Sequence, residues 1–300
     1  LLVPRGQKPR FFRYPLLHEG DTPAKLDAAR AYLVESGQRS LPVTIDSPEY
    51  ELARPWVEAT RGGDRSELMK VAETYHEVLH VATRYHRSVS DGLFDRPAPQ
   101  ILLLHANAVG AAQWDRLFTW LAANGYRFAG AEEVLTDPAF AEPPRYVASR
   151  GPGLWDRIAA LRRREEVRAA LTGLLAVQQA AWNRGDLEAF TEVYTDDALF
   201  VASSGIHRGR GEVLERYRRR YPDREAMGTL SFEILEIRAV DGMERSILGD
   251  SRPSRVHGAT VVATWRLDFA EPGRDPASGY TMLSFVFTSD GWKIAQDASF

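Results

Sequence analysis

The chain has 300 residues, 44% of them hydrophobic, which is enough for two folded domains with cores of their own. Its net charge of −3 offers no basic excess, so we expect no nucleic-acid partner. The lack of cysteine excludes disulfides and thiolate metal sites, and no apolar run approaches the roughly 20 residues of a membrane span.

The first half of the chain alternates short apolar runs with helical patterns. We predict strands at FFRYP, LPVTID and QILLLHA, and helices over residues 22–37, 64–88 and 111–125. Strands separated by helices favour right-handed crossovers and a parallel sheet or barrel. Three clear strands are about half of what a closed α/β barrel contains.

Polar side chains stand at the ends of the three predicted strands, at Arg13, Asp46 and His105. If the strands are parallel neighbours, these side chains meet at one edge of the sheet. A carboxylate bonded to a histidine fixes its tautomer, and an arginine can hold a second carboxylate with two hydrogen bonds. The alternative for His105 alone is a half-buried histidine bonded to a backbone group.

These strand ends resemble the polysaccharide deacetylases of carbohydrate esterase family 4. RYP at 13–15, DSPEY at 46–50 and LLH at 103–105 are similar to the third, fourth and fifth motifs of that family, in the same order. The resemblance implies a partial (β/α) barrel of deacetylase type over residues 1–153. It also implies hydrolysis of N-acetyl groups of an amino-sugar polymer or a related N-acyl substrate, at the cell envelope or outside the cell.

The resemblance assigns roles to the motif residues. Arg13 would orient a catalytic aspartate, Asp46 would pair with His105, and His105 would be the general acid that protonates the departing amine. Leu103 would line the acetyl pocket, and Tyr50 would replace the usual tryptophan of the groove wall. The residues expected to bind substrate are Tyr14, Tyr50 and Leu103.

The family's first two motifs supply an aspartate base and the ligands of the metal, and neither motif occurs in this sequence. Zinc or another divalent metal would therefore have its ligands in an upstream segment, and we expect the chain as given to be inactive. Three histidines, His76, His80 and His86, share the predicted helix over 64–88. We expect them at the surface or rim of the barrel, because such spacing alone is common.

The pattern changes in the second half of the chain. Residues 137–153 are rich in proline and glycine, and a linker helix is predicted over 154–166, with its arginine run at 162–164 in solvent. Helices followed by alternating strands then indicate an α+β domain over 167–300. The predicted elements are helices at 167–185, 186–194 and 210–221, strands at 230–240, 259–270 and 279–300, a hairpin turn at Ser289–Gly291 and a polar insertion at 242–258.

Residues 167–300 resemble the cone-shaped fold shared by nuclear transport factor 2, ketosteroid isomerase and small polyketide cyclases. The resembling stretches are WNRGDLEAFTEVYTDDALFVASSG, HRGRGEVLERY and GWKIAQDASF. The resemblance implies a curved antiparallel sheet that encloses a pocket. Asp297 either faces that pocket as a base with a raised pKa or is an exposed or capping carboxylate. The expected lining, with plain core packing as the alternative, is Trp182, Tyr194, Phe200, Tyr217, Trp265 and Phe287.

The two halves lead to hypotheses from different classes. The first is a metal-dependent deacetylase, a hydrolase of non-peptide carbon–nitrogen bonds that acts on an acetylated saccharide or small N-acyl substrate. The alternative is a non-catalytic module whose cone fold binds a small ligand or forms a homodimer, and a third hypothesis is an isomerase or cyclase that uses Asp297. The compartment stays open, because LLVPRG belongs either to a tag linker or to the native chain and no signal peptide is visible.

Overall fold

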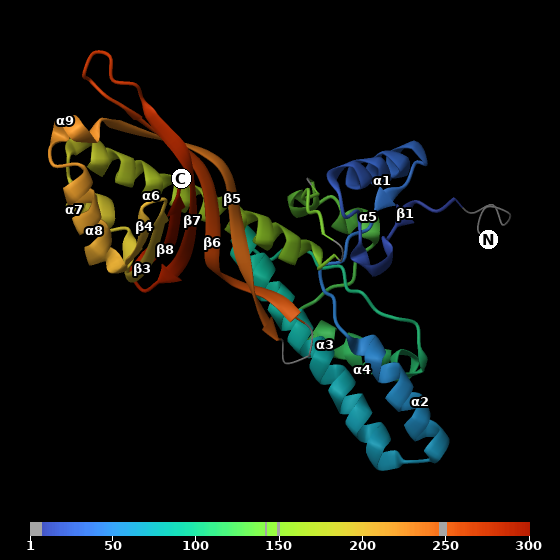
Figure 1. The fold of residues 1–300 in the computed structure, drawn as a ribbon. Helices are drawn as coiled ribbons and strands as arrows, with labels where there is room; N and C mark the ends of the chain where they lie inside the picture. Colours follow the sequence, from blue (N-terminus) through green and yellow to red (C-terminus); the bar gives the residue numbers. More distant parts are fainter. Residues whose placement is uncertain (1–7, 142, 149–150, 246–250) are drawn as a thin grey trace. The chain divides into compact units, whose positions relative to one another are not determined.

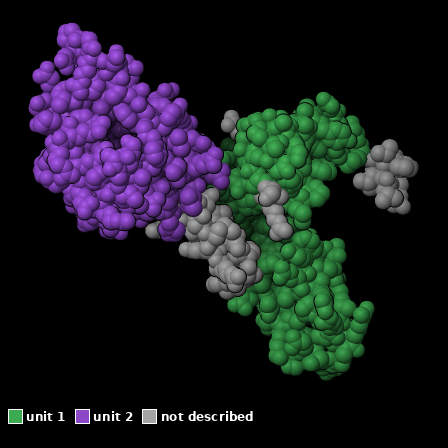
Figure 2. Space-filling view, in the orientation of Figure 1, with its two compact units in different colours: residues 1–161, 247–250 green, residues 162–246, 251–300 purple. Residues whose placement is uncertain are grey.

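The computed structural model describes residues 8–141, 143–148, 151–245 and 251–300. The chain forms two compact units, Leu1–Leu161 with Ile247–Asp250 and Arg162–Ser246 with Ser251–Phe300, which Figure 2 distinguishes by colour. No helix in the described part of the chain is both long enough and apolar enough to cross a bilayer.

The first unit is mainly helical (Figure 1). Side-chain caps fix where three of its helices begin: Thr22, Asp64 and Asn107 each accept a hydrogen bond from the backbone N–H three residues later. Its helices are α1 (Pro23–Glu35), α2 (Ala53–Gly62), α3 (Arg65–Phe94), α4 (Ala108–Ala123) and α5 (Ala131–Val134), with 3-10 helices η2 (Pro15–Leu17), η3 (Glu49–Leu52) and η4 (Pro138–Phe140).

Near the three predicted strands of this unit the chain forms two parallel pairings, and both are much shorter than expected. Strand β1 (Phe11–Phe12) pairs in parallel with β2 (Arg39–Ser40), and Ile45 forms a parallel bridge with Leu102. Each ladder stops after one or two residues, so the described residues form short parallel pairs, and a deacetylase-type barrel is not shown.

Two of the three histidines of α3 are buried, so the prediction of a surface or rim position was wrong for them, while His80 is partly buried. His76 and His86 are 1% and 2% exposed. His76 Nε2 lies 3.0 Å from Gln113 Oε1, and the ring of His80 stacks on Trp120 at 3.7 Å between centroids. Helix α4 covers this side of α3, because both helices turn an apolar face toward a shared core.

The second unit is an α+β domain. Its helices are α6 (Leu154–Arg184), of which residues 154–161 belong to the first unit, α7 (Leu187–Thr191), α8 (Gly209–Arg220) and α9 (Arg224–Met227). Helix α6 is continuous through the predicted linker at 154–166, so the linker and the first helix of the domain are one element. The strands are β3 (Tyr194–Ala202), β4 (Gly205–Arg208), β5 (Thr229–Arg245), β6 (Ser251–Asp268), β7 (Ala277–Thr288) and β8 (Gly291–Ser299).

These strands form one curved sheet in the order β4-β3-β8-β7-β6-β5, with helices α6 to α9 on one face (Figure 1). All neighbours are antiparallel except the parallel pair β3 and β8. The predicted hairpin turn is confirmed, since β7 ends at Thr288 and β8 begins at Gly291. Most of the predicted insertion at 242–258 is strand instead, because β5 and β6 continue their ladder as far as Arg245 and Ser251; residues 246–250 lie outside the described part.

Gly279 gives a stability prediction for this sheet. A Cβ at Gly279 would overlap the carbonyl oxygen of Phe300 and lie 2.8 Å from Trp265 Cζ2. We therefore expect Gly279→Ala to lower the free energy of unfolding by about 1–3 kcal/mol through overpacking. Urea denaturation, monitored by circular dichroism, would measure this change in the free energy of unfolding. The control is Gly211→Ala in α8, where a Cβ meets nothing within 4 Å. An unchanged stability in Gly279→Ala would contradict this packing.

Candidate functional site

A buried carboxyl group lies at the centre of the second unit. Asp297 is 4% exposed and is surrounded by three hydroxyl groups. Tyr194 donates to Oδ2 at 2.6 Å and Thr281 donates to Oδ1 at 3.0 Å. Ser299 Oγ lies 2.6 Å from Oδ1 and 3.0 Å from Thr281 Oγ1. Both carboxyl oxygens therefore have partners within the protein.

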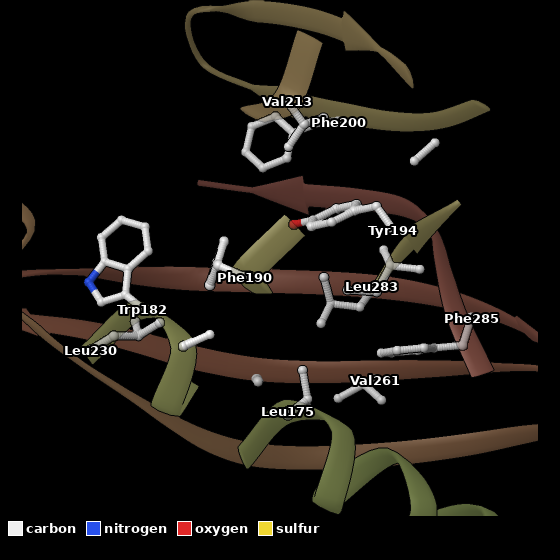
Figure 3. Packing of buried hydrophobic residues seen from close by; sticks show 14 of the residues in the cluster. Leu175, Trp182, Phe190, Tyr194, Phe200, Val213, Leu230, Val261, Leu283 and Phe285 are labelled. Atoms are coloured by element: carbon white, nitrogen blue, oxygen red, sulfur yellow. The ribbon is translucent and has the colours of Figure 1, made fainter. Parts of the chain in front are cut away.

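The order and register of the strands place Asp297 in this position. Strand β8 lies between β3 and β7, and Asp297 is directly opposite Phe200 on one side and Leu283 on the other. Residues in register on neighbouring strands share a face of the sheet, so the carboxyl group has an apolar neighbour on each side. Phe200 and Leu283 are both buried in the core beneath the helices (Figure 3).

A β-bulge explains why the sequence alone did not show on which face of the sheet Asp297 lies. The pairing of β7 with β8 shifts register between Ser284 and Phe285, where β8 contains one extra residue, Ala295. A bulge reverses the alternation of side chains beyond it. Ile294 and Asp297, three residues apart, therefore both point into the core. The exposed or capping alternative for Asp297 is not what the structure shows.

Burial controls the ionisation of this cluster. Desolvation raises the pKa of Asp297, while the hydrogen bonds from Ser299, Tyr194 and Thr281 and the charge of Arg216 act in the opposite direction. Desolvation and the neighbouring carboxyl group also raise the pKa of Tyr194 well above its usual value. A carboxyl group of raised pKa beside a tyrosine hydroxyl can donate a hydrogen bond to a ligand or exchange a proton with it.

A pocket of about 290 Å³ opens above Asp297. Figure 3 shows Trp182, Tyr194 and Phe200 of its wall, contributed by α6 and β3. Phe287 was wrongly assigned to the lining, because it lies near the end of β7, is 53% exposed and contacts the Trp292 ring outside the pocket. The structure places the other predicted residues around this one pocket, namely Trp182, Tyr194, Phe200, Tyr217, Trp265 and Asp297.

Several polar groups of the pocket were not predicted from the sequence. Arg216 and Arg220 of α8 line it, and so does Gln178 of α6, which is 2% exposed. In the described part of the chain, the buried atoms Gln178 Oε1 and Trp265 Nε1 have no hydrogen-bond partner. The only sequence signal was the group of arginines at 216 and 218–220 around Tyr217, a pattern that is equally typical of a solvated helix face.

In the first unit the structure brings Glu49, Tyr50 and His105 together. Glu49 is fully buried, and its Oε1 lies 2.8 Å from His105 Nδ1 and accepts a hydrogen bond from the His105 backbone N–H at 2.9 Å. The ring of Tyr50 lies 4.9 Å from the His105 ring. Glu49, the acidic residue of DSPEY, thus has the contact with His105 that the sequence interpretation gave to Asp46.

The other motif residues lie on neighbouring segments of the same unit. Asp46 is close enough to Arg13 for its charge to oppose the lowering of the Arg13 pKa by burial. Tyr14 lies against Phe12 at 5.1 Å between ring centroids, and desolvation raises its pKa. Leu103 is held by its backbone N–H, which donates to the Ile45 carbonyl at 3.0 Å.

The deacetylase resemblance also implies a metal. Among the residues that the structure describes, no group of three or more His, Cys, Asp or Glu side chains is arranged to hold a metal ion. The expectation that the metal ligands come from an upstream segment stays a prediction.

Comparison with known proteins identifies the second unit. Residues 176–296 match the family model of the SnoaL-like domain. This part of the chain is thus a SnoaL-like domain with the cone fold of nuclear transport factor 2. No curated protein matches the chain.

Several solved structures are similar to part of the chain. An NTF-2 like protein of unknown function from Shewanella oneidensis MR-1 has 30% identity, covers 44% of this chain and 97% of its own, and has a TM-score of 0.36. A ketosteroid isomerase-like protein from Erwinia carotovora atroseptica SCRI1043 has 19% identity, covers 44% and 92%, and has a TM-score of 0.32. A cystatin-like domain of unknown function from Nostoc punctiforme PCC 73102 has 18% identity, covers 44% and 75%, and has a TM-score of 0.35.

The raised pKa of Asp297 predicts how stability depends on pH. Between the ordinary aspartate pKa of 3.8 and the raised value, the folded state holds a proton that the unfolded state has released, so a rise in pH favours unfolding. The unfolding free energy of the wild type minus that of Asp297→Asn should therefore fall across this window and level off above it.

Denaturant titrations of both proteins at a series of pH values would measure this difference. Tyr194→Phe removes a hydrogen bond that lowers the pKa of Asp297, so in that variant the fall should extend to higher pH. A difference that rises with pH would mean that the carboxylate, and not the carboxylic acid, is the form that the fold favours.

Proposed function

We propose that the SnoaL-like domain at residues 176–296 binds a small, largely aromatic ligand in the pocket above Asp297. The observation that carries this proposal is a pocket of about 290 Å³ whose aromatic walls surround a buried acid of raised pKa. Pockets that combine apolar walls with a few convergent polar groups are typical small-molecule sites.

The size and walls of the pocket support a ligand of one or two rings. Its volume is at the lower end of the range for small-molecule sites. Trp182 packs edge-on against Phe190 and Tyr217, with ring centroids 5.0 and 5.7 Å apart. Rings that hold one another in this way form a pre-organised apolar wall, which reduces the entropy lost on binding.

The polar atoms without partners support a ligand that makes hydrogen bonds. A buried donor or acceptor left unpaired costs about 1–3 kcal/mol. Within the described residues, Gln178 Oε1 and Trp265 Nε1 are two such atoms, and both side chains line the pocket. A ligand that offers a donor to Gln178 and an acceptor to Trp265 would offset part of that cost.

A binding assay with 2-naphthol tests the proposed function. We expect 2-naphthol to bind the chain and to change the fluorescence of Trp182 and Trp265, which both line the pocket. Ser278→Trp places a large ring at an exposed position of the lining, so it should weaken binding by at least about tenfold.

The matched control is Ser289→Trp, in the exposed hairpin turn outside the pocket lining, and it should bind 2-naphthol like the wild type. Equal weakening in both variants, or no binding by the wild type in calorimetry, would contradict a ligand site in this pocket.

A second candidate function concerns the first unit, where the contact between Glu49 and His105 favours an acid–base role. We propose that Glu49 holds a proton on His105 Nδ1, so that Nε2 is the atom that exchanges protons with a substrate amine. Deacetylation of an N-acyl substrate would also need a base and a metal. The motifs that supply these groups in the deacetylases do not occur in this sequence, so we assign His105 the role of general acid and nothing more.

The tautomer of His105 tests this proposal. Nitrogen NMR of the neutral imidazole should show the proton on Nδ1, and Glu49→Ala should remove that preference, because the acceptor is lost. Glu51→Ala, two residues along at an exposed position, should leave the tautomer unchanged. A proton on Nε2 in the wild type would contradict the proposed role. So would zinc-dependent acetate release from chitotetraose that persists in His105→Ala.

A further inference from the structure

Two arginines of α8 reach the same pocket. Arg216 and Arg220 are four residues apart, so they lie one above the other on one face of the helix, and both line the pocket. The guanidinium of Arg216 lies 4.5 Å from the ring centroid of Phe200 and 5.3 Å from that of Tyr217. It is therefore held over the aromatic wall and not extended into solvent.

Neither arginine has a carboxylate partner among the described residues. Arg218, between them in the sequence, pairs with both Glu188 and Glu215, so those carboxylates are already engaged. Arg220 Nε donates to the Tyr221 hydroxyl at 3.2 Å, and its terminal nitrogens form no other hydrogen bond within the described chain. The two guanidinium groups thus keep donors for a further acceptor.

The charges around the pocket are unbalanced. Asp297 is the only acidic residue among its described lining, against two arginines, and the oxygens of Asp297 are already bonded to Tyr194, Thr281 and Ser299. Guanidinium groups bind carboxylates with two parallel hydrogen bonds, and they do so more strongly where aromatic surfaces exclude water.

From this arrangement we infer that the ligand is an aromatic carboxylate whose anionic group is bound by Arg216 and Arg220 while its ring lies against the aromatic wall. This inference rests on the proposed function, since it specifies the chemistry of the ligand in the same pocket. In this arrangement the two arginines determine the specificity of the site, and Asp297 contacts the uncharged part of the ligand.

Isothermal titration of the full chain with 2-naphthoate and 2-naphthol at about pH 7 tests the inference, because the two probes share a ring system and differ in charge. We expect 2-naphthoate to bind at least about tenfold more tightly than 2-naphthol. Arg220→Gln, at an exposed position, should remove most of this advantage by weakening the binding of 2-naphthoate far more than that of 2-naphthol. Arg216→Gln should do the same, with circular dichroism to check that it folds.

Arg219→Gln is the matched control, because Arg219 is on the same helix but does not line this pocket. It should bind both probes like the wild type, and added sodium chloride should reduce the preference for 2-naphthoate. If both probes bind equally, or if Arg220→Gln weakens both alike, the inference is wrong and the proposed function stands. If neither probe binds, both are wrong.

Discussion

A carboxyl group buried at the centre of the sheet is the constraint on which the second unit depends. Desolvation of Asp297 is unfavourable unless its oxygens find partners, and three hydroxyls from β3, β7 and β8 supply them. These partners meet only because β8 lies between β3 and β7 in the observed register. The strand order, the bulge at Ala295 and the position of Tyr194 are thus linked to one side chain.

The same arrangement gives the pocket its chemical character. The helices cover one face of the curved sheet with aromatic rings, and the space above Asp297 is lined both by these rings and by polar atoms. Those atoms are of different kinds: an acid of raised pKa at the base, an amide oxygen on α6 that has no partner among the described residues, and two guanidinium groups on α8. A site with apolar walls and separate polar groups selects a ligand by where its own polar atoms lie.

The sequence predicted the class of the second unit and most of its pocket, because those features depend on local patterns. Alternating strands after helices, the hairpin at Ser289–Gly291 and the aromatic residues on the core face follow from side-chain periodicity. The face of the sheet on which Asp297 lies does not follow from periodicity, because a bulge changes the alternation of side chains and no residue pattern in the sequence indicates the bulge. The roles of Arg216 and Gln178 depend on tertiary contacts and could not be predicted either.

In the first unit the parallel direction of the chain segments was predictable from the sequence. The strand lengths and the contact of Glu49 with His105 were not, because both depend on which segments meet in space.

The most direct test of the account is the side-chain carboxyl resonance of Asp297, followed by carbon NMR as pH is varied, with and without 2-naphthol. We predict that this carboxyl group titrates above the ordinary aspartate pKa of 3.8, and that its resonance moves when the probe occupies the pocket. A group that titrates at or below 3.8, with a resonance that the probe does not change, would contradict both the buried acid and the ligand site built around it.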